Sequence, residues 1–341
     1  MNRQLETDIR EFARFFPLSS NLAGSRFMIT GATGLIGSTC VRCLLALDKG
    51  ISITIPVRNQ AKASAMYGTN ASQLKIVECD LREYCSSFDE EFDYIIHCAS
   101  PTAGSYMNEH PVETYEMAVE TTRFLLQYAR KHHVNSIVYI SSLEYYGQNF
   151  DDKIITEDFQ GYVDATSARS SYPMGKRAAE YLCFAYAKEY DIPVKVARLT
   201  QTFGAGVAAD DNRVFAQFAR SVIAGADIIL HTTGDSAKPY CYTTDCASAI
   251  LTILLKGTNG EAYNVANQDT YISIRDMAEF LRENFNPRIN VVITENSGMG
   301  YAPVTKLHLS SEKLAALGWK PKYNLYSMFS KLIKGLHNDD K

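Results

Sequence analysis

Short apolar segments alternate with longer amphipathic segments from residue 26 to about residue 200. Apolar runs at residues 26–30, 51–57, 74–77, 94–97, 137–140 and 194–198 predict strands. Segments with helical spacing lie between several of these runs, at about residues 35–47, 112–131 and 172–190. Short apolar strands separated by helices are typical of a parallel sheet that is covered on both faces. The pattern therefore predicts an α/β fold with a doubly wound parallel sheet.

A glycine-rich turn, Gly31-Ala-Thr-Gly34-Leu-Ile-Gly37, joins the first predicted strand to the helix that follows it. In the Rossmann fold, a turn in this setting binds the pyrophosphate of a dinucleotide at the N-terminus of the helix. Gly31 would make the tight turn, Gly34 would let the backbone approach the phosphates, and Gly37 would let the helix lie close to the sheet. Backbone N–H groups for the phosphates would come from Thr33, Leu35 and Ile36.

The second predicted strand ends at Arg58, where proteins that bind NAD commonly place an acidic residue for the ribose diol. Arg58 would face the 2′-phosphate of NADP, or it would stack on the adenine of either dinucleotide. We therefore expect NAD as the cofactor, with NADP open because of Arg58. Asp80 and Leu81 follow the third strand and are expected to meet the adenine. Ribose and nicotinamide are expected to pass the end of the fourth strand, at Cys98, Ala99 and Ser100.

Tyr172 and Lys176 are four residues apart in a predicted helix and therefore share one face of it. The ammonium of Lys176 would favour the phenolate form of Tyr172 and lower the pKa of that side chain. A phenol tuned in this way exchanges a proton with a sugar hydroxyl while hydride moves to or from a nicotinamide. Ser142, just after the fifth predicted strand, would hold that hydroxyl in place.

The pattern changes after residue 204. Gly, Asp and Pro interrupt residues 205–240, and helical spacing returns at about residues 213–224, 272–283 and 310–317. We predict a dinucleotide-binding domain over residues 26–204 with about 240–268, and a smaller C-terminal substrate-binding lobe over residues 205–239 with 269–341. Residues 1–25 form a helical extension, since apolar residues recur there at near-helical spacing. That helix would pack on the body of the protein or on a partner subunit.

Composition narrows the class of function. The 341 residues carry 34 Lys and Arg against 38 Asp and Glu, a formal net charge of -4, which argues against a nucleic-acid surface. No apolar run approaches the roughly 18 residues of a membrane span, and the N-terminal residues do not have the pattern of a secretory signal. With eight cysteines that fit a reducing compartment, we expect a cytoplasmic protein. Cys40 and Cys43 are spaced like half a zinc site without a second pair, so we expect no metal.

These motifs together resemble the extended short-chain dehydrogenase/reductase family, the NAD-dependent nucleotide-sugar epimerases, dehydratases and decarboxylases. The resemblance runs from residue 26 to about residue 332 and includes Gly318-Trp-Lys-Pro321, which is similar to the family's closing segment. Three segments look most like the UDP-glucuronate decarboxylases of this family. They are His97-Cys-Ala-Ser-Pro101, Ser171-Tyr-Pro-Met-Gly-Lys-Arg177 and Val196-Ala-Arg-Leu-Thr-Gln-Thr-Phe-Gly204.

The resemblance implies roles for individual residues. Tyr172 would be the acid/base, with Lys176 as its partner. Ser142 would orient the sugar, and Glu144 matches the glutamate that decarboxylases and 4,6-dehydratases place beside the sugar. Leu143 departs from the family, because dehydratases have there an Asp that expels water, and this counts against 4,6-dehydration. Substrate contacts implied in the same way are Gln201 (in place of a common Asn), Arg213, Lys238 (in place of a common Arg) and Tyr240.

The family chemistry starts with NAD(P)-dependent oxidation of the sugar at carbon 4. A ketone there leads to decarboxylation if carbon 6 is a carboxylate, to the epimer if hydride returns to the other face, or to dehydration if water leaves carbon 6. We expect an enzyme like UDP-glucuronate decarboxylase. A 4-epimerase, a 4,6-dehydratase, a net NADPH-dependent reductase and a non-catalytic nucleotide-binding protein are the alternatives. The implied partner is a nucleotide-diphosphate sugar, and helices 112–131 and 172–190 would form a homodimer interface.

Overall fold

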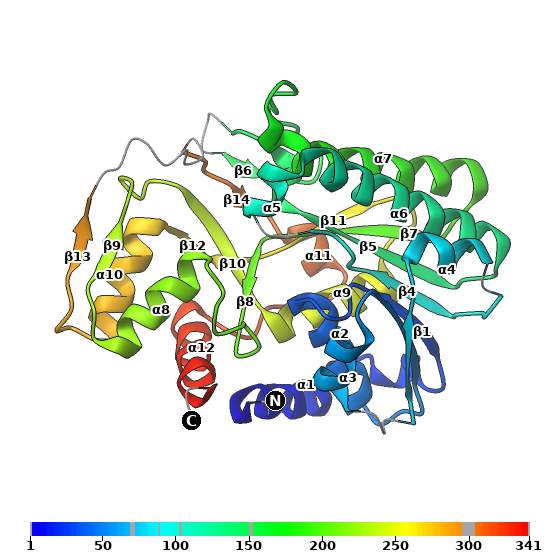
Figure 1. Cartoon of the computed structure of the whole chain (residues 1–341), viewed down its shortest axis with the longest axis horizontal. Coiled ribbons are helices and arrows are strands. Elements are labelled where there is room, and N and C mark those ends of the chain that lie inside the picture. The colour runs from blue at the N-terminus through cyan, green and yellow to red at the C-terminus, as the bar shows by residue number, and fades with distance from the viewer. Residues whose placement is uncertain are drawn as a thin grey trace.

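Parallel strands form the largest sheet of the protein. The computed structural model describes residues 2–68, 72–87, 89–101, 104–149, 153–294 and 304–339. Seven strands pair in the order β11-β7-β5-β4-β1-β2-β3, and every pairing is parallel. Their bounds are β1 Arg26–Thr30, β2 Ser52–Val57, β3 Leu74–Glu78, β4 Tyr94–His97, β5 Ser136–Ser142, β7 Val194–Leu199 and β11 Ala262–Val265. The predicted doubly wound parallel sheet is confirmed (Figure 1).

The strand order reverses at β1. The chain first adds β2 and β3 on one side of β1, and then crosses over to add β4 on the other side. In open α/β sheets, ligands bind at such a point, outside the carboxyl ends of the strands. Thr30 of β1 and His97 of β4 are paired in register. The glycine turn after β1 and the loop after β4 therefore begin side by side.

Helices cover both faces of the large sheet (Figure 1). Alternate side chains of β1 point to opposite faces, so Phe27 and Ile29 belong to one apolar cluster and Met28 to another. The first face is covered by α2 (Leu35–Ala46), α3 (Gln60–Tyr67) and α9 (Thr243–Lys256). The second face is covered by α4 (Leu81–Ser87), α6 (Pro111–Lys131) and α7 (Ser171–Tyr190), with the short α5 (Gly104–Glu109) next to α6. In the described part of the chain, no helix is both long and apolar enough to cross a bilayer.

The second lobe has its own apolar core, in which Phe203 packs against Phe215 and Phe329. Its elements are α8 (Val214–Ala224), β9 (Ile228–Leu230), α10 (Ile274–Phe285), β13 (Val291–Ile293) and α12 (Leu325–Asp339). A three-stranded sheet of β8 (Gln201–Phe203), β10 (Ala237–Tyr242) and β12 (Asn267–Ser273) lies between the two parts. Tyr240 and Tyr242 of β10 face the second core, whereas Cys241 faces the first. A further short pair joins β6 (Ile154–Ile155) and β14 (His308–Leu309).

Part of the segment 269–341, which we expected in the second lobe, packs on the large sheet instead. Leu314 of α11 (Glu312–Ala316) and Trp319 after it are buried in the core of that sheet. The Trp319 indole donates a hydrogen bond to the carbonyl oxygen of Asp245 at 3.2 Å and to the Ser248 hydroxyl at 2.9 Å. The chain then returns to the second lobe through α12. The buried indole and its two hydrogen bonds hold this segment against the first core.

The N-terminal extension forms α1 (Arg3–Phe15), which contacts α2 and α9 of the large domain and α12 of the second lobe. Leu5 and Phe12 are buried in the core of the large sheet. Asp8 is 0% exposed, and its carboxylate accepts a hydrogen bond from Lys331 of α12 at 2.7 Å. The first and last helices therefore lie side by side (Figure 1), and the extension packs on the body of this chain.

Candidate active site

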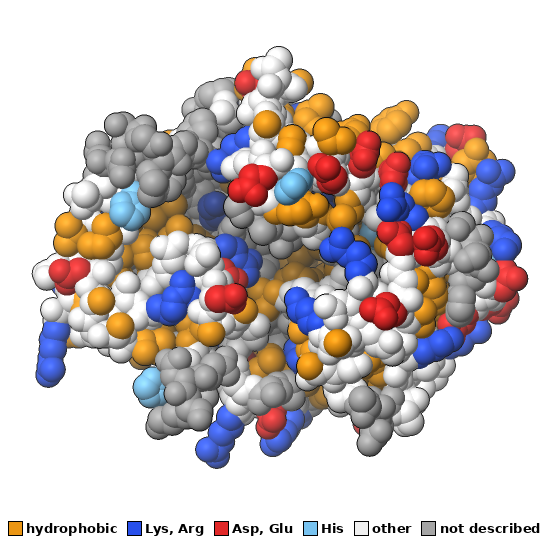
Figure 2. Space-filling view, in the orientation of Figure 1, with side chains coloured by type: hydrophobic (Ala, Val, Ile, Leu, Met, Phe, Trp, Pro, Cys, Tyr) orange, Lys and Arg blue, Asp and Glu red, His pale blue; other side chains and the backbone are white. Residues whose placement is uncertain are grey.

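A cleft of about 830 Å³ opens at the carboxyl ends of the large sheet. Figure 2 shows the hollow, with Lys and Arg side chains at its edge. All residues that the sequence predicts for the dinucleotide line this cleft: Gly31, Thr33, Gly34, Leu35, Ile36, Gly37, Arg58, Asp80, Leu81, Cys98, Ala99 and Ser100. Six of the predicted catalytic and substrate residues line it too: Ser142, Glu144, Tyr172, Lys176, Gln201 and Arg213. Lys238 and Tyr240 do not belong to this lining.

The three glycines of the turn meet different requirements. Gly31 has a φ of +65°, and a Cβ there would lie 2.7 Å from the backbone nitrogen of Ala99. A Cβ on Gly37 would collide with the carbonyl oxygen of Gly31. Gly34 has an ordinary φ of -88°, and a Cβ there would lie 3.4 Å from the same oxygen. Close packing therefore requires glycine at positions 31 and 37. Gly34 instead keeps space open above the N-terminus of α2, which has no side-chain cap. This space fits a pyrophosphate.

Thr30 ties the glycine turn to the loop after β4. Its hydroxyl lies 2.7 Å from Nδ1 of His97 and accepts a hydrogen bond from the backbone N–H of Ala99 at 3.2 Å. Burial lowers the pKa of His97 to about 3, and the nearby charge of Lys176 adds to this, so the imidazole is neutral. No role was predicted for Thr30 from the sequence, although its position directly before the glycine turn could have indicated one.

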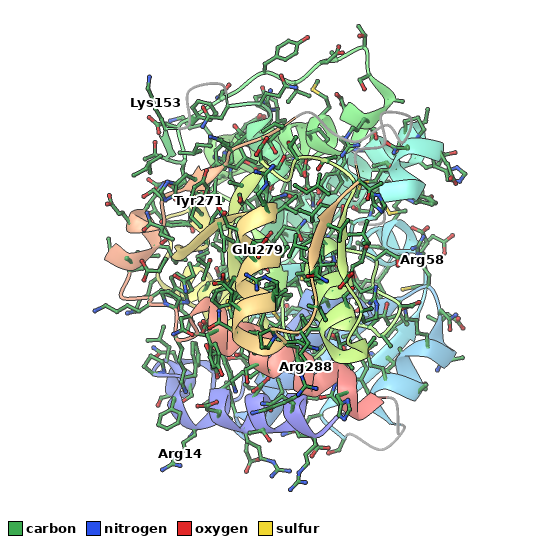
Figure 3. All side chains as sticks on the ribbon, turned by 90° about the vertical axis from the view of Figure 1, so that its left-hand side faces the viewer. Arg14, Arg58, Lys153, Tyr271, Glu279 and Arg288 are labelled. Atoms are coloured by element: carbon green, nitrogen blue, oxygen red, sulfur yellow. The ribbon has the colours of Figure 1, made fainter. Side chains whose placement is uncertain are left out.

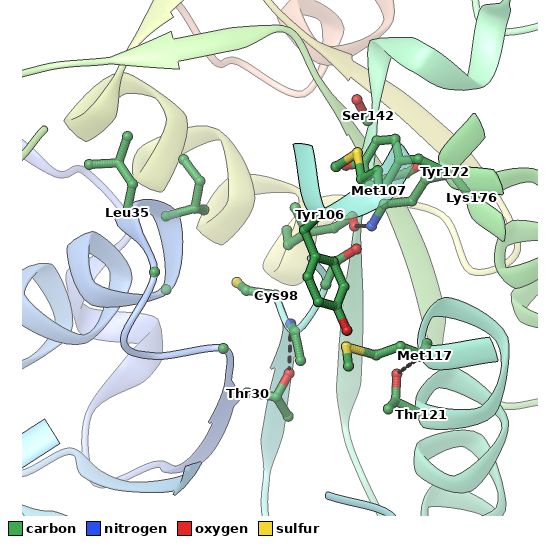
Figure 4. A pocket seen from close by; sticks show the side chains of 18 of the residues that line it. Thr30, Leu35, Cys98, Tyr106, Met107, Met117, Thr121, Ser142, Tyr172 and Lys176 are labelled. Atoms are coloured by element: carbon green, nitrogen blue, oxygen red, sulfur yellow. Dashed lines mark hydrogen bonds between the residues drawn. The ribbon is translucent and has the colours of Figure 1, made fainter. Parts of the chain in front are cut away.

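Ser142, Tyr172 and Lys176 lie together on the wall of the cleft opposite Leu35 of the glycine turn (Figure 4). The Ser142 hydroxyl lies close enough to the Tyr172 phenol to lower the pKa of that phenol. The Lys176 ammonium donates to the carbonyl oxygen of Ile140 at 2.8 Å and lies 5.5 Å from the centroid of the Tyr172 ring. β5 and the start of α7 thus bring the three predicted groups to one place.

The pKa of Tyr172 corrects the sequence prediction. We expected Lys176 to lower it, but burial raises it above its ordinary value, and the charge of Glu144 adds to the rise. The nearby Ser142 hydroxyl acts on this pKa in the opposite direction. Burial also lowers the pKa of Lys176 to about 8. The spacing of the two residues places them on one helical face, but it does not reveal that burial dominates the pKa of Tyr172. Burial therefore favours the protonated form of the phenol.

A buried ion pair lies behind Lys176. Glu180, one helical turn further along α7, is 0% exposed, and its Oε2 lies 2.8 Å from Nη2 of Arg198 in β7. The same carboxylate accepts a hydrogen bond from Ser141, the neighbour of Ser142 in β5. Glu180 thus joins the strand that carries the serine, the helix that carries the lysine, and β7. The sequence analysis missed this pair, because nothing in the local pattern shows which buried charges meet.

The predicted substrate residues occupy different environments. Glu144 is exposed and lines the cleft, and Gln201 lines it from β8. Arg213 also lines the cleft, with its guanidinium held by Asp211 at 3.0 Å. Lys238 lies outside the lining, yet close enough to Glu144 for that charge to oppose the lowering of its pKa by burial.

Tyr240 is placed away from the cleft. Its side chain is 3% exposed and packs against Phe203 in the core of the second lobe. The pairing of β10 with β12 shifts register between Lys238 and Tyr240, an irregularity that sequence spacing does not reveal. The structure therefore does not bring Tyr240 to the sugar end of the site.

Further residues enter the cleft that the sequence analysis did not assign. Tyr106 and Met107 of α5 stand between the glycine turn and Tyr172 (Figure 4). Lys62 of α3 and Arg82 of α4 line the cleft beyond the ends of β2 and β3. They lie on the short helices after β2 and β3, whose side-chain directions the sequence pattern left open.

Several known proteins resemble this chain in sequence or in fold. UDP-glucuronic acid decarboxylase 6 of Arabidopsis thaliana is 26% identical over 320 residues, which covers 91% of this chain and 90% of the plant protein. UDP-glucuronic acid decarboxylase 3 of the same plant is 27% identical over 304 residues, with 88% and 85% covered. Among solved structures, UDP-glucose 4-epimerase of Thermotoga maritima has a TM-score of 0.79 at 20% identity, with 92% of this chain and 99% of that chain covered.

Another solved structure, dTDP-glucose 4,6-dehydratase of Streptomyces venezuelae with NAD bound, has a TM-score of 0.76 at 21% identity, with 92% and 97% covered. At such identities the solved structures show the fold. The family itself is shown by a family model that matches residues 27–266, which is more than half of the chain. With its glycine turn and its Ser142, Tyr172 and Lys176 in one cleft, the chain belongs to the NAD dependent epimerase/dehydratase family.

Proposed function

We propose that the chain is a nucleotide-sugar decarboxylase that acts on a UDP-linked uronate through oxidation at carbon 4. The observation that carries the proposal is the cleft in which Tyr172, Ser142 and Glu144 face the glycine turn. Leu143, where a dehydratase would have its acid, is 4% exposed and cannot supply a proton. The similarity to the plant UDP-glucuronic acid decarboxylases supports the same choice.

Ser142, Tyr172 and Lys176 have separate roles in the oxidation at carbon 4. Bound in this cleft, an oxidised nicotinamide would supply the hydride acceptor and a positive charge. Ser142 holds the carbon 4 hydroxyl, and the phenolate oxygen of Tyr172 takes its proton as hydride leaves carbon 4. The nearby Ser142 hydroxyl favours that phenolate, whereas burial opposes it, and the ammonium of Lys176 lies 5.5 Å from the centroid of the ring.

The ketone at carbon 4 makes the sugar a β-keto acid. The bond between carbons 5 and 6 breaks, carbon dioxide leaves, and the electron pair passes into an enolate across carbons 4 and 5. Glu144, exposed in the cleft, orders the water that protonates carbon 5. Hydride then returns to carbon 4 while Tyr172 donates its proton to the oxygen, so the cycle is redox-neutral.

A net reductase of a nucleotide-linked sugar is the second candidate. The raised pKa of Tyr172 suits a group that starts as a proton donor to a ketone oxygen. Arg58 at the adenosine end supports a phosphorylated dinucleotide, which a reductase would release after each turnover. A 4-epimerase and a 4,6-dehydratase have no comparable observation in their favour.

Product mass tests the proposal. The purified chain would be incubated with UDP-glucuronate, UDP-glucose, dTDP-glucose and a CDP-linked sugar, each with NAD and with NADPH. We expect UDP-glucuronate to lose carbon dioxide without net consumption of dinucleotide. Release of label from carbon 6 of UDP-glucuronate gives an independent readout. Unchanged UDP-glucuronate together with epimerised, dehydrated or reduced product from another sugar would refute the decarboxylase.

A further inference from the structure

The N-terminal helix α1 is anchored to the large sheet by apolar packing. Leu5, Ile9 and Phe12 share one face of the helix, and all three are buried in the core of that sheet. Phe12 also stacks on Phe16, with 5.1 Å between the ring centroids. Burial of apolar surface stabilises this contact without fixing the direction of any one bond. It holds α1 on the domain that carries the glycine turn.

Polar contacts tie the same helix to the second lobe. Asp8 is buried, and its carboxylate accepts hydrogen bonds from Lys331 of α12 and from the hydroxyl of Tyr242 in β10. Glu11 accepts a hydrogen bond at 2.9 Å from the hydroxyl of Tyr323, a residue of the second core. Figure 1 and Figure 3 show α1 and α12 side by side. Hydrogen bonds to charged groups are short and directional, so these contacts fix where the second lobe lies relative to α1.

Ala205, two residues beyond the end of β8, is bonded through both of its backbone groups. Its carbonyl oxygen accepts a hydrogen bond at 2.6 Å from Nδ2 of Asn2, the residue whose side-chain oxygen caps α1. Its N–H donates at 3.3 Å to the hydroxyl of Tyr242, which in turn binds Asp8. A Cβ on Gly335 of α12 would lie 2.9 Å from the Ala205 oxygen. Side chains of α1, or side chains that α1 binds, therefore hold this residue against α12.

The segment after β8 connects one side of the cleft to the glycine turn. β8 carries Gln201 into the lining, and the chain beyond Gly206 leads to Arg213, which lines the cleft as well. A Cβ on Gly206 would lie 3.4 Å from Leu5 of α1 and 3.7 Å from Leu35, the cleft residue that begins α2. The segment is therefore in contact with α1 and with the glycine turn at the same point.

We propose that α1 sets the position of the β8 side of the cleft relative to the glycine turn, with Asn2 and Asp8 as positioning residues for the half that receives the nucleotide sugar. The apolar face of α1 stays on the dinucleotide domain when the polar contacts are lost, so the β8 side shifts and the glycine turn does not. If α1 only covered the edge of the sheet, loss of these contacts would change overall stability alone. This role of α1 does not depend on which sugar is converted.

Asn2→Asp isolates the contact with Ala205. An aspartate still caps α1, but it places an oxygen where Nδ2 now lies 2.6 Å from the Ala205 carbonyl oxygen, and two acceptors repel each other. Hydrogen exchange of the full-length chain, read by mass spectrometry, should become faster at residues 203–207 by about fivefold or more, the scale of one lost hydrogen bond. Exchange in β1 and α2 should stay the same. Unchanged exchange at residues 203–207 would overturn the proposal.

Two control variants separate this effect from a general loss of stability. Glu6→Gln removes a charge of α1 that pairs with Arg10 on the surface, and it should leave exchange at residues 203–207 as it was. Val134→Ala removes two buried methyl groups from the core on the other face of the large sheet, so it lowers the free energy of unfolding from a distant place. Equal acceleration at residues 203–207 in Val134→Ala and Asn2→Asp would mean that this segment opens only by global unfolding, which contradicts the proposal.

Ligand binding to the full-length chain gives a second readout. The probes are UDP and NADH, each titrated by calorimetry into protein freed of nucleotide. In Asn2→Asp and in Asp8→Asn, the dissociation constant of UDP should rise by about fivefold, while that of NADH changes by less than about twofold. An equal loss for both ligands would refute the positioning role. Absence of UDP binding by the unaltered chain would refute the proposed substrate instead, and the exchange result, which needs no ligand, would still decide the role of α1.

Discussion

The ion pair between Glu180 and Arg198 gives the sharpest test of how the site is held. Glu180→Gln keeps the volume of the side chain but removes its charge, and the guanidinium of Arg198, 2% exposed, is left in the interior. Breaking a buried pair costs about 3 to 5 kcal/mol. Arg198 retains the Tyr146 hydroxyl at 3.1 Å and the Glu157 carbonyl oxygen at 2.6 Å. We therefore expect the free energy of unfolding to fall by about 3 kcal/mol, at the lower end of that range.

Urea unfolding measures this loss, followed by circular dichroism and by the fluorescence of Trp319. That residue is the single tryptophan of the chain and lies in the core of the large sheet. Agreement between the two signals tests whether the chain unfolds as one unit. The matched control is Glu279→Gln, which removes the same type of charge from a pair with Arg282 on the outer helix α10 (Figure 3). Its unfolding midpoint should not move measurably.

A double variant tests whether the isolated charge of Arg198 causes the loss of stability. Glu180→Gln with Arg198→Met removes both charges, so it should be more stable than Glu180→Gln alone. Glu180 also raises the pKa of Lys176 against the effect of burial, which sets that pKa at about 8. If activity requires the ammonium of Lys176, activity falls as pH rises through about 8. In Glu180→Gln this fall in activity should come at a lower pH. A loss below about 1 kcal/mol, or a double variant less stable than the single one, would refute the account.

Three further predictions follow from the same geometry. Tyr172→Phe should lower turnover by about 100-fold or more while the dinucleotide dissociation constant stays the same, because only proton transfer is lost; equal loss in both would contradict the assigned role. The pKa of His97 is about 3 in the folded chain and near 6.5 in the unfolded chain. Protonation of the unfolded chain therefore lowers the free energy of unfolding by about 1.4 kcal/mol per pH unit as pH falls from 6.5 toward 3. In His97→Gln, urea unfolding at two acidic pH values should show a smaller loss of this free energy per pH unit. Asp8→Asn should lower the free energy of unfolding by about 1 to 3 kcal/mol, since it weakens the bond from Lys331 to a buried carboxylate, and an unchanged urea midpoint would show that α1 is not held there.

The sequence by itself determined the sheet and many of the residues that line the cleft. Short-range rules suffice for these, because strand alternation, the glycine turn and the four-residue spacing of Tyr172 and Lys176 depend on a few neighbouring residues. Gly31 and Gly37 are needed for backbone reasons that their place between a strand and a helix already indicates. The order of strands in the structure then brings the ends of β1 and β4 together.

Only the tertiary structure decided the energetics of those groups. Burial, which depends on every element packed around α7, reverses the expected direction of the pKa of Tyr172. Asp8 meets Lys331 across 323 positions of sequence, and Glu180 meets Arg198 from a separate strand. Tyr240 is a core residue of the second lobe, where it packs against Phe203. Charges interact over distances in space, whereas sequence patterns report neighbours along the chain, and the partners of buried charges therefore become visible only once the chain is folded.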